Sequence, residues 1–410
     1  MRTAKVVIGA NYGDEGKGLM TDYFAAQSNN SLVVRFNGGC QASHTVTTPD
    51  GRRHAFSHFG AGTFTGARTY LSRHFAVNPT LYAKERAKLL PLIGRLPTLY
   101  VDTRAPVTTF FDMLVNQLVE DSRGDKRHGS CGMGFGETIG RQEGEMFALT
   151  VGDLLDVTAL RAKLLQIRDS HLPARCKELG LPDFGKHHEL CTTDVLVDAF
   201  IVAAQEFLGD VTLVSEAEEP VILAKNVVFE GAQGLMLDQH HGAFPYVTRS
   251  NTGLRNALDV ASEAGITKLD VNYVTRAYMT RHGAGPLAHE LPGRPYEGVV
   301  DLTNQPNEYQ GTLRFADLDL DQVALAIGTD LADVFGTHVH INAHLAITCL
   351  DQIGGDVPAR VRLENTLHRV STDELIAIAS SRILPVAYCS WGPTRDAVRV
   401  RQIKRMVIAA

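Results

Sequence analysis

A glycine-rich segment directly after an apolar run constrains this chain more than any other feature. Residues 6–8 are Val-Val-Ile, as in a buried strand, and residues 13–18 are Gly-Asp-Glu-Gly-Lys-Gly, followed at 19–25 by a stretch that can form a helix. Glycines let the backbone turn tightly and present its N–H groups, and a helix start adds unpaired donors and a partial positive charge. A strand, a glycine loop and a helix in this order predict a phosphate-binding site.

The predicted loop carries side chains of opposite charge. Lys17 suits a phosphate, whereas the carboxylate of Asp14 repels one unless it binds a metal or takes up a proton, so its presence indicates chemistry. The loop is not a Walker A motif, GxxxxGK[ST], because Asn11 stands at the position of the first glycine and Gly18 at that of the magnesium-binding hydroxyl. A plain glycine turn with a solvated lysine is the alternative.

The whole sequence sets wider limits. Its 410 residues suffice for one large α/β body or two packed domains, and a net charge of −6 without a long basic run argues against a nucleic-acid partner. No apolar run approaches the length needed to cross a membrane. The six cysteines are scattered without a CxxC pair, and the N-terminus enters a strand without a signal-peptide core. We therefore expect free thiols and a cytoplasmic location.

Apolar runs alternate with helix-type periodicity along most of the chain. This alternation predicts an α/β fold with a large, mostly parallel central sheet, helices on both faces, added small lobes and a P-loop-like phosphate site. Residues 287–310 are rich in proline, glycine and polar side chains, which predicts a long excursion near a site. The predicted strands are 5–8, 32–36, 99–101, 227–229, 271–279, 346–350 and 386–389, and the predicted helices are 79–90, 108–120, 193–208, 251–264, 320–327 and 372–383.

Three further glycine-rich clusters follow the first. Residues 37–45 come after the predicted strand 32–36, and there His44 suits a general acid or a hydrogen-bond donor to a phosphate. Residues 128–138 alternate glycines with small polar groups and suit a second phosphate. Gln233, in a turn that ends a strand, and Thr248 beyond it are uncharged hydrogen-bonding groups of the kind that orient a ligand. Because parallel strands end at one edge of a sheet, these clusters predict one ligand site.

Together the clusters resemble the adenylosuccinate synthetase family nearly from end to end. The matching segments are GDEGKG at 13–18, QASHT at 41–45 in place of NAGHT, EGAQG at 230–234, HGAFPYVTRSNT at 241–252, TRHGAGP at 280–286 and SWGP at 390–393. The resemblance implies one synthetase domain over residues 1–410 and a homodimer. It also implies a ligase of purine nucleotide biosynthesis that joins L-aspartate to C6 of IMP or dGMP through a 6-phosphoryl intermediate, with Mg²⁺ and with GTP, ATP or dATP. A nucleotide-binding regulator that has lost ligation is the alternative.

The resemblance also assigns roles to single residues. Asp14 would take the proton from N1 of the purine so that O6 can attack the γ-phosphoryl group, and Mg²⁺ would bind the Asp14 carboxylate and the main-chain carbonyl of Ser43. Lys17, His44 and Gln233 would complete the catalytic set. The nucleotide-binding positions that it implies are Gly13, Glu15, Gly16, Gly18, Gln41, Ser130 or Cys131, Arg141, Thr248, Asp351, Gly392 and Pro393. Arg141 would be donated across the two-fold axis of the dimer.

The sequence departs from the family pattern in the segments for aspartate and for the donor base. The aspartate-binding segment, residues 307–314, is short and has a single arginine, so Thr312 and Arg314 are the candidates for the substrate carboxylate. Asp351 is kept for reading the donor purine, but Cys349 replaces the lysine that stacks on the base, which leaves GTP, ATP and dATP open.

A third departure concerns the acceptor nucleotide. Gln41 and Ser43 replace an asparagine and a glycine, which is similar to a viral branch of the family that acts on dGMP. Members of that branch can carry serine in place of the aspartate that is Asp14 here. IMP and dGMP therefore both stay open, and a viral enzyme of this kind would work in the host cytoplasm.

Overall fold

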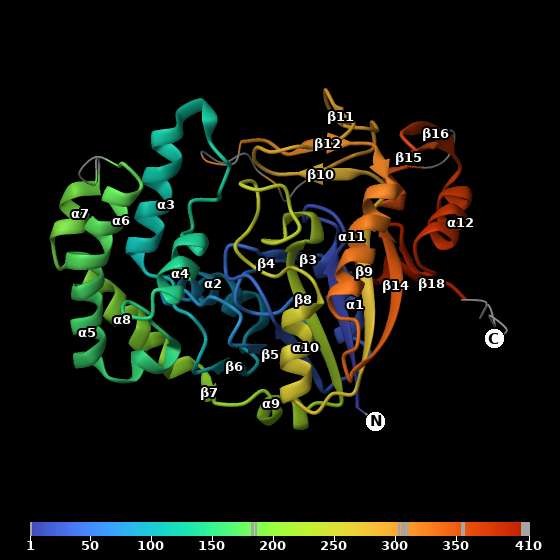
Figure 1. Ribbon diagram of the computed structural model, residues 1–410. Coiled ribbons are helices and arrows are strands. Elements are labelled where there is room, and N and C mark those ends of the chain that lie inside the picture. Colours follow the sequence, from blue (N-terminus) through green and yellow to red (C-terminus); the bar gives the residue numbers. More distant parts are fainter. Residues whose placement is uncertain are drawn as a thin grey trace.

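The computed structural model describes residues 2–402 apart from residues 182, 183, 185, 186, 302, 303, 305–308, 310 and 354–356. The strands of its central sheet are β1 (Thr3–Gly9), β2 (Ser31–Arg35), β5 (Arg68–Leu71), β6 (Leu99–Asp102), β7 (Thr212–Val214), β8 (Asn226–Gly234), β9 (Lys268–Arg276), β14 (His340–Thr348), β17 (Val386–Ser390) and β18 (Val398–Val400). Within the described residues they form a ten-stranded sheet in the order β18-β17-β14-β9-β1-β8-β2-β5-β6-β7 (Figure 1). Neighbouring strands run parallel except β17 and β18, which are antiparallel.

Helices cover both faces of this sheet, and β1 shows why. Its side chains alternate between the two faces, as in any strand. Val6 and Ile8 pack in the larger apolar core with Leu254, whereas Val7 packs on the opposite face with Phe24. The helices are α1 (Lys17–Ala25), α2 (Pro79–Ile93), α3 (Phe110–Arg123), α4 (Phe135–Glu143), α5 (Val157–Gln166), α6 (Leu172–Glu178), α7 (His188–Thr192), α8 (Val195–Asp210), α9 (Glu218–Ile222), α10 (Leu254–Glu263), α11 (Leu320–Asp333) and α12 (Thr372–Arg382).

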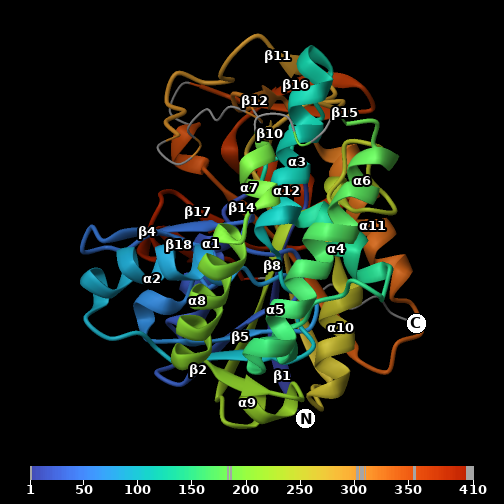
Figure 2. The same cartoon turned by 90° about the vertical axis from the view of Figure 1, so that its left-hand side faces the viewer.

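Two kinds of lobe are added to the sheet. Helices α3 to α8 gather on one side and enclose a second apolar core, to which β5 and β6 also contribute (Figures 1 and 2). On the other side lie small sheets made of β10 (Met279–Arg281), β11 (Glu290–Leu291) and β12 (Arg314–Ala316), and of β13 (Leu318–Asp319), β15 (Ala359–Leu363) and β16 (Thr366–Val370). A hairpin of β3 (His44–Thr47) and β4 (Arg53–Phe56) follows β2.

The predicted fold class is confirmed, with differences in detail. The predicted strand 271–279 is wrong as one element, because β9 ends at Arg276 and a separate strand, β10, begins at Met279. The strand predicted at 346–350 starts earlier, at His340, since its first half lies towards the exposed end of the sheet and lacks an apolar run. Strands β5 and β7 were not predicted; they are short, with three or four residues.

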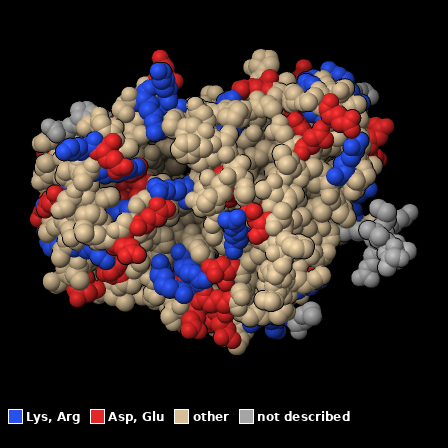
Figure 3. All heavy atoms as spheres, viewed as in Figure 1, with Lys and Arg blue, Asp and Glu red and all other residues tan. Residues whose placement is uncertain are grey.

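Two observations bear on the possible partners of the chain. In the described part of the chain, helices that combine the length and the apolar character needed to span a bilayer are absent. On the face shown in Figure 3, acidic and basic side chains are interspersed rather than separated into patches of one sign.

Candidate functional site

The loop after β1 is folded around a buried carboxylate. Glu15 is 1% exposed, and its Oε1 accepts the main-chain N–H groups of Asn11 at 3.0 Å and Gly13 at 2.8 Å. Its Oε2 lies 2.6 Å from Nζ of Lys17. A Cβ on Gly234 would lie 2.6 Å from Oε1 of Glu15, so β8 approaches the loop this closely only with glycine there. The Glu15 side chain is thus used inside the loop, and only its main-chain N–H can meet a phosphate.

The end of the loop starts helix α1 between two other segments. Gly16 takes φ 96° at the N-cap, a conformation that favours glycine. On one side, Thr348 at the end of β14 donates its hydroxyl to the main-chain oxygen of Glu15 at 2.6 Å. On the other side, a Cβ on Gly18 would lie 3.0 Å from Cβ of His44, so the helix touches the start of β3. The glycines predicted to bind phosphate therefore lie at a helix N-terminus, beyond the carboxyl end of a central strand.

Asp14 lies in the same loop, at φ 63°, with a side chain that is 29% exposed. Nε2 of His282 lies 3.2 Å from Oδ2 of Asp14, and Arg276 donates a hydrogen bond to its main-chain oxygen. Burial would raise the pKa of Asp14, but the hydrogen bond from His282 and the charges of His282, Arg276 and Lys17 lower that pKa to about 2. Asp14 is therefore an ionised carboxylate at neutral pH.

His282 was not predicted as a site residue. It occupies the variable position of the TRHGAGP segment, and only the packing of the loop after β10 against the loop after β1 brings it to Asp14. Burial lowers the pKa of His282, but the hydrogen bond and charge of Asp14 outweigh burial and raise it above the usual histidine value.

His44 begins β3 and is buried against the end of β8. Its Nδ1 lies 2.7 Å from Oε1 of Glu230, whose Oε2 accepts the N–H of Ala61 at 3.1 Å and lies 3.8 Å from Nε of Arg35. Burial lowers the pKa of His44, although Glu230 acts in the opposite direction. With Nδ1 held by Glu230, Nε2 is the nitrogen left for a ligand. Lys17 shifts the pKa of both His44 and Asp14, so one cation neighbours both predicted catalytic groups.

Glu230 was not predicted either, although it is part of the EGAQG segment. The signal was available: β8 pairs with β2, which leads into residues 37–44, so a carboxylate at the end of β8 can reach a histidine that follows β2.

Two glutamine side chains end in buried polar atoms close to this loop. Within the described part of the chain, Oε1 of Gln233 and Nε2 of Gln41 have no hydrogen-bond partner. A Cβ on Gly13 would lie 3.8 Å from Cα of Gln233, which shows how near the phosphate loop lies. Buried polar atoms without partners cost free energy unless a ligand or water meets them. Both glutamines were predicted to contact the nucleotide, and their buried atoms without partners support that prediction.

The predicted second phosphate loop reaches the segment after β10. Gly129 packs directly on Gly283 of the TRHGAGP segment, where a Cβ would overlap the Gly283 backbone. Oγ of Ser130 accepts a hydrogen bond from Asn116 at 2.7 Å, while burial raises the pKa of the Cys131 thiol. The Ser130 side chain is thus already engaged within the chain, and Cys131 is kept as a neutral thiol.

Arg141, predicted to be donated across a two-fold axis, is bound inside its own chain. It is 1% exposed, and its guanidinium binds the carboxylate of Asp112 through Nε at 2.9 Å and through a terminal nitrogen at 2.8 Å. The main-chain oxygens of Phe147 and Val107 accept further hydrogen bonds from it at 2.8 and 2.7 Å. The guanidinium is thus engaged inside its own chain. That Arg141 reaches a nucleotide across a two-fold axis stays a prediction, and it would require these contacts to be released.

Arg314, predicted to bind the substrate carboxylate, is paired inside the chain. Its Nε lies 2.7 Å from Oε1 of Glu290, a second guanidinium nitrogen also binds that carboxylate, and the main-chain oxygens of Gly283 and Gly285 accept further hydrogen bonds at 3.0 and 2.9 Å. A substrate carboxylate would have to displace Glu290, which is 40% exposed. Thr312 lies two residues before Arg314. Residues 307, 308 and 310 of the predicted aspartate-binding segment lie outside the described residues.

The residues predicted to read the donor base follow β14 and β17. Asp351 lies in the short helix η7 (Leu350–Gln352), and burial raises the pKa of its carboxyl. Gly392 and Pro393 form the turn after β17, where the hydroxyl of Ser390 donates to the main-chain oxygen of Gly392 at 2.7 Å. The structure thus brings the two predicted segments to the same edge of the sheet.

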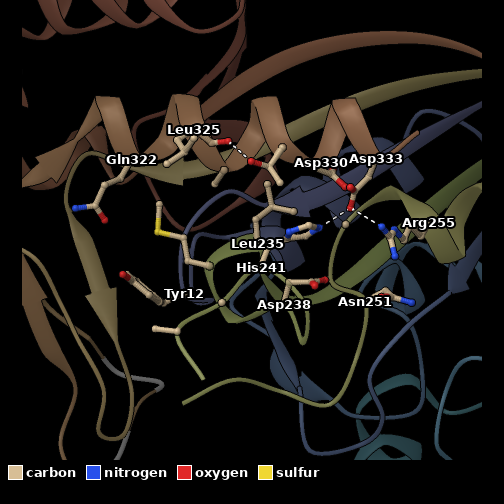
Figure 4. A pocket seen from close by; sticks show the side chains of 16 residues that line it. Tyr12, Leu235, Asp238, His241, Asn251, Arg255, Gln322, Leu325, Asp330 and Asp333 are labelled. Carbon is tan, nitrogen blue, oxygen red and sulfur yellow. Dashed lines mark hydrogen bonds and ion pairs between the residues drawn. The ribbon is translucent and has the colours of Figure 1, made fainter. Parts of the chain in front are cut away.

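A cavity of about 330 Å³ lies between α11 and the chain that follows Gln233 (Figure 4). Tyr12 of the phosphate loop and Met236 line one part of it. At the other end His241 lies 2.6 Å and Arg255 3.1 Å from the carboxylate of Asp333. His241 and Arg255 therefore use the same carboxylate, and the cavity backs directly on the segments that carry the predicted nucleotide ligands.

Comparisons with known proteins identify relatives of the chain. The profile of the family described as adenylosuccinate synthetase matches residues 6–314. The adenylosuccinate synthetase of Synechocystis sp. is 31% identical over 297 residues, which cover 72% of this chain and 65% of the relative. That of Synechococcus sp. is 33% identical over 298 residues, covering 72% and 66%. The chain thus spans just under two thirds of the length of these curated relatives.

Two solved structures share the fold at lower sequence identity. The fully ligated adenylosuccinate synthetase from Plasmodium falciparum is 18% identical, with a TM-score of 0.72 over 97% of this chain and 100% of the other. The cyanophage S-2L succinoaminodeoxyadenylate synthetase (PurZ), bound to dGMP and to dATP as an energy donor, is also 18% identical, with a TM-score of 0.61 over 98% and 95%. At this identity the likeness concerns the fold.

Proposed function

Because this chain belongs to the adenylosuccinate synthetase family, we propose that it joins L-aspartate to C6 of a purine nucleoside monophosphate and converts a purine triphosphate to diphosphate and phosphate. The observation that carries the proposal is the grouping of an ionised carboxylate, Asp14, with Lys17 and His44 around the N-terminus of α1. Glycine loops and a helix N-terminus bind phosphates, but a carboxylate among them calls for a proton-transfer or cation-binding role.

The first step is activation of the purine oxygen. In the proposed reaction Asp14 accepts the proton of purine N1, and the electron density that this leaves makes O6 a nucleophile for the γ-phosphoryl group. Phosphoryl transfer depends mainly on positioning and charge neutralisation. Lys17 and the N–H groups of the loop would hold the transferring phosphoryl. His44, protonated as the phosphates bind and with its Nδ1–H held by Glu230, would donate from Nε2 to the departing diphosphate.

A divalent cation fits this site by the chemistry of its donors. Mg²⁺ prefers carboxylate and carbonyl oxygens and phosphate oxygens. Asp14 faces His282 through one carboxylate oxygen and is partly exposed, so the other oxygen can accept a cation, together with the main-chain carbonyl of Ser43. When bound, Mg²⁺ neutralises charge on the transferring phosphoryl group.

The second step is displacement of the phosphate from C6 by the amine of aspartate. Gln41 and Gln233, whose buried polar atoms lack partners within the described chain, would hold the acceptor nucleotide while this happens. Arg314, once released from Glu290, is our proposed partner of the aspartate carboxylate.

IMP and dGMP are both proposed acceptors, and they need separate assays. They differ in the purine 2-amino group and in the ribose 2′-hydroxyl. The structural likeness to a synthetase bound to dGMP and dATP supports keeping dGMP, whereas the curated relatives named adenylosuccinate synthetase support IMP.

The test is a ligation assay with the full chain, Mg²⁺ and a purine triphosphate. IMP or dGMP is supplied in parallel, with and without L-aspartate, and the succinyl nucleotide is detected by chromatography and mass spectrometry. We expect product and phosphate release only when nucleotide and aspartate are both present. Asp14→Ala should lower the rate roughly a thousandfold or more, because it removes the base and a cation ligand together. Equal triphosphate consumption without aspartate, or near-normal turnover by Asp14→Ala, would refute the proposal. Tight nucleotide binding without any product would favour the alternative of a regulator.

A further inference from the structure

We propose that the indole of Trp391 is the stacking platform for the base of the donor nucleotide, and that this platform accepts adenine and guanine alike. The inference rests on the proposed function, because it assigns a residue and a substrate class to the donor site of that ligase. It starts from a side chain that the argument above leaves unused: an aromatic ring, 41% exposed, in the turn directly before Gly392 and Pro393.

The sheet register places Trp391 beside the position where a base contact is missing. Ile347 of β14 lies opposite Cys389 of the parallel strand β17. Continued by two residues past both strand ends, this register would set Cys349 level with Trp391. Helix η7, which carries Asp351, packs against β17, so the turns after both strands share one edge of the sheet.

This edge is tied to the phosphate loop by two contacts. The hydroxyl of Thr348 donates to the main-chain oxygen of Glu15, and the guanidinium of Arg395, four residues after Trp391, lies 3.0 Å from the carboxylate of Asp22 in α1. A triphosphate held at the start of α1 therefore has the turns after β14 and β17 on one side. On its other side lie His44 and the segments for the acceptor. A base that extends towards β17 would reach the turn that carries Trp391, whose side chain is partly exposed.

Position 349 cannot supply the stacking surface itself. Cys349 has φ 59°, and its sulphur lies 3.8 Å from the hydroxyl of Thr348 and close to Arg276 and Tyr278. The small side chain is thus turned into the protein. The backbone of Trp391, by contrast, is fixed at the surface, since its N–H donates to the main-chain oxygen of Ala397 at 3.1 Å. The stacking contact with the donor base that a long side chain at position 349 would make can instead be made by Trp391, which follows the neighbouring strand.

A stacking platform predicts broad base selectivity. Every nucleobase has a π face, so stacking on an aromatic ring discriminates weakly between bases. A carboxylate such as that of Asp351 accepts hydrogen bonds both from the adenine amino group and from the two guanine donors. We therefore expect affinities for ATP and GTP within about tenfold of each other, since a single neutral hydrogen bond contributes about that much.

The sequence offers a direct probe, because Trp391 is its single tryptophan. Tryptophan fluorescence of the wild-type chain is followed while non-hydrolysable ATP and GTP analogues, or inorganic tripolyphosphate, are added. Calorimetry supplies the concentrations that saturate each. We expect both nucleotides to quench the fluorescence of the indole. Tripolyphosphate, which lacks a base, should leave this fluorescence unchanged. Saturating nucleotide without quenching would overturn the proposal, and so would equal quenching by tripolyphosphate, because the indole would then report a change of the loop rather than a stacked base.

Kinetics of variants give a second, independent measurement. Trp391→Ala should raise the KM for ATP and for GTP roughly tenfold, the usual loss for one base stack, and leave the KM for the acceptor nucleotide unchanged. Trp391→Phe should restore most of the loss. Phe335→Ala, which removes a ring that is 94% exposed at the end of α11, is the matched control and should change neither KM. An unchanged donor KM in Trp391→Ala would refute the platform while ligation itself persists. Failure of the proposed function looks different, since the wild-type chain would then bind nucleotide without ligation or not bind it at all.

Discussion

Replacing Glu15 by glutamine tests how the phosphate loop is held in shape. Glutamine keeps an oxygen that can accept the N–H groups of Asn11 and Gly13, now 3.0 and 2.8 Å from Oε1, but it removes the charge 2.6 Å from Nζ of Lys17. Lys17 is 3% exposed, so the substitution leaves a buried ammonium without its counter-charge. Removing one partner of a buried ion pair costs about 3–5 kcal/mol, and we expect Glu15→Gln to lower the free energy of unfolding by that amount.

The same reasoning predicts a rescue by phosphate. A ligand that binds only the folded chain stabilises it by about 2.7 kcal/mol at a concentration 100 times its Kd. In the Glu15→Gln variant, tripolyphosphate also supplies the missing negative charge next to Lys17. At equal tripolyphosphate concentration the variant should therefore bind the ligand more tightly and gain more stability than the wild-type chain, and the difference in unfolding free energy between the two chains should narrow. Urea denaturation followed by circular dichroism, with and without tripolyphosphate, measures both quantities.

A matched control separates burial from loss of charge. Glu143 is 60% exposed and lies 2.5 Å from Arg249, so Glu143→Gln breaks a solvent-exposed ion pair of similar geometry. Exposed ion pairs contribute about 0–1 kcal/mol to stability. Tripolyphosphate should not alter the difference in unfolding free energy between Glu143→Gln and the wild-type chain. A loss below about 1 kcal/mol in Glu15→Gln, or a deficit that tripolyphosphate leaves unchanged, would show that Lys17 is satisfied elsewhere and that the loop does not depend on this pair.

Three further predictions concern Glu85, Gly18 and His44. Burial would raise the pKa of Glu85, but hydrogen bonds from histidines, including His58, lower it from 4.5 to about 2, so its contribution to stability is present above pH 4.5 and is lost as pH falls towards 2. The contribution amounts to about 3 kcal/mol, and Glu85→Gln should flatten this part of an acid-denaturation profile; an unchanged slope would contradict the assignment. Gly18→Ala should lower ligation at least tenfold with little unfolding, because its Cβ would lie 3.0 Å from Cβ of His44, whereas Gly136→Ala, with nothing within 4 Å, should keep normal rates. His44→Asn should cost on the order of a hundredfold in rate at unchanged stability, and a rate near wild type would place the site elsewhere.

Much of the fold was predictable because it follows from local patterns. Runs such as 32–36 and 227–229 are apolar on both faces of the sheet, which identifies central parallel strands, and β2 and β8 are there. The loop at Gly13–Gly18 was predictable because glycines with positive φ are needed there, as at Gly13 and Gly16. Both signals lie within a few residues of sequence.

The contacts that shape the site were harder to predict because they join distant segments. Glu230 and His44 are 186 residues apart, and His282 meets Asp14 only because β9 lies beside β1 in the sheet. Arg141 shows a different difficulty. A motif gives a residue's position in the chain but not the direction of its side chain, and the carboxylate of Asp112 draws this guanidinium inwards.

Glu15 and Glu230 have the same structural role, which was not predicted from the sequence. Glu15 pairs with Lys17 at 2.6 Å, and Glu230 pairs with His44 at 2.7 Å. Without them, Lys17 and an imidazolium at position 44 would repel one another, and Lys17 does act to lower the pKa of His44. The carboxylates thus hold two hydrogen-bond donors in place before any ligand arrives. The same balance has a consequence for the ligand. Because the loop's own charges are already compensated, the negative charges of a triphosphate next to Asp14 need a further counter-charge, and this is a physical reason to expect a divalent cation at the site.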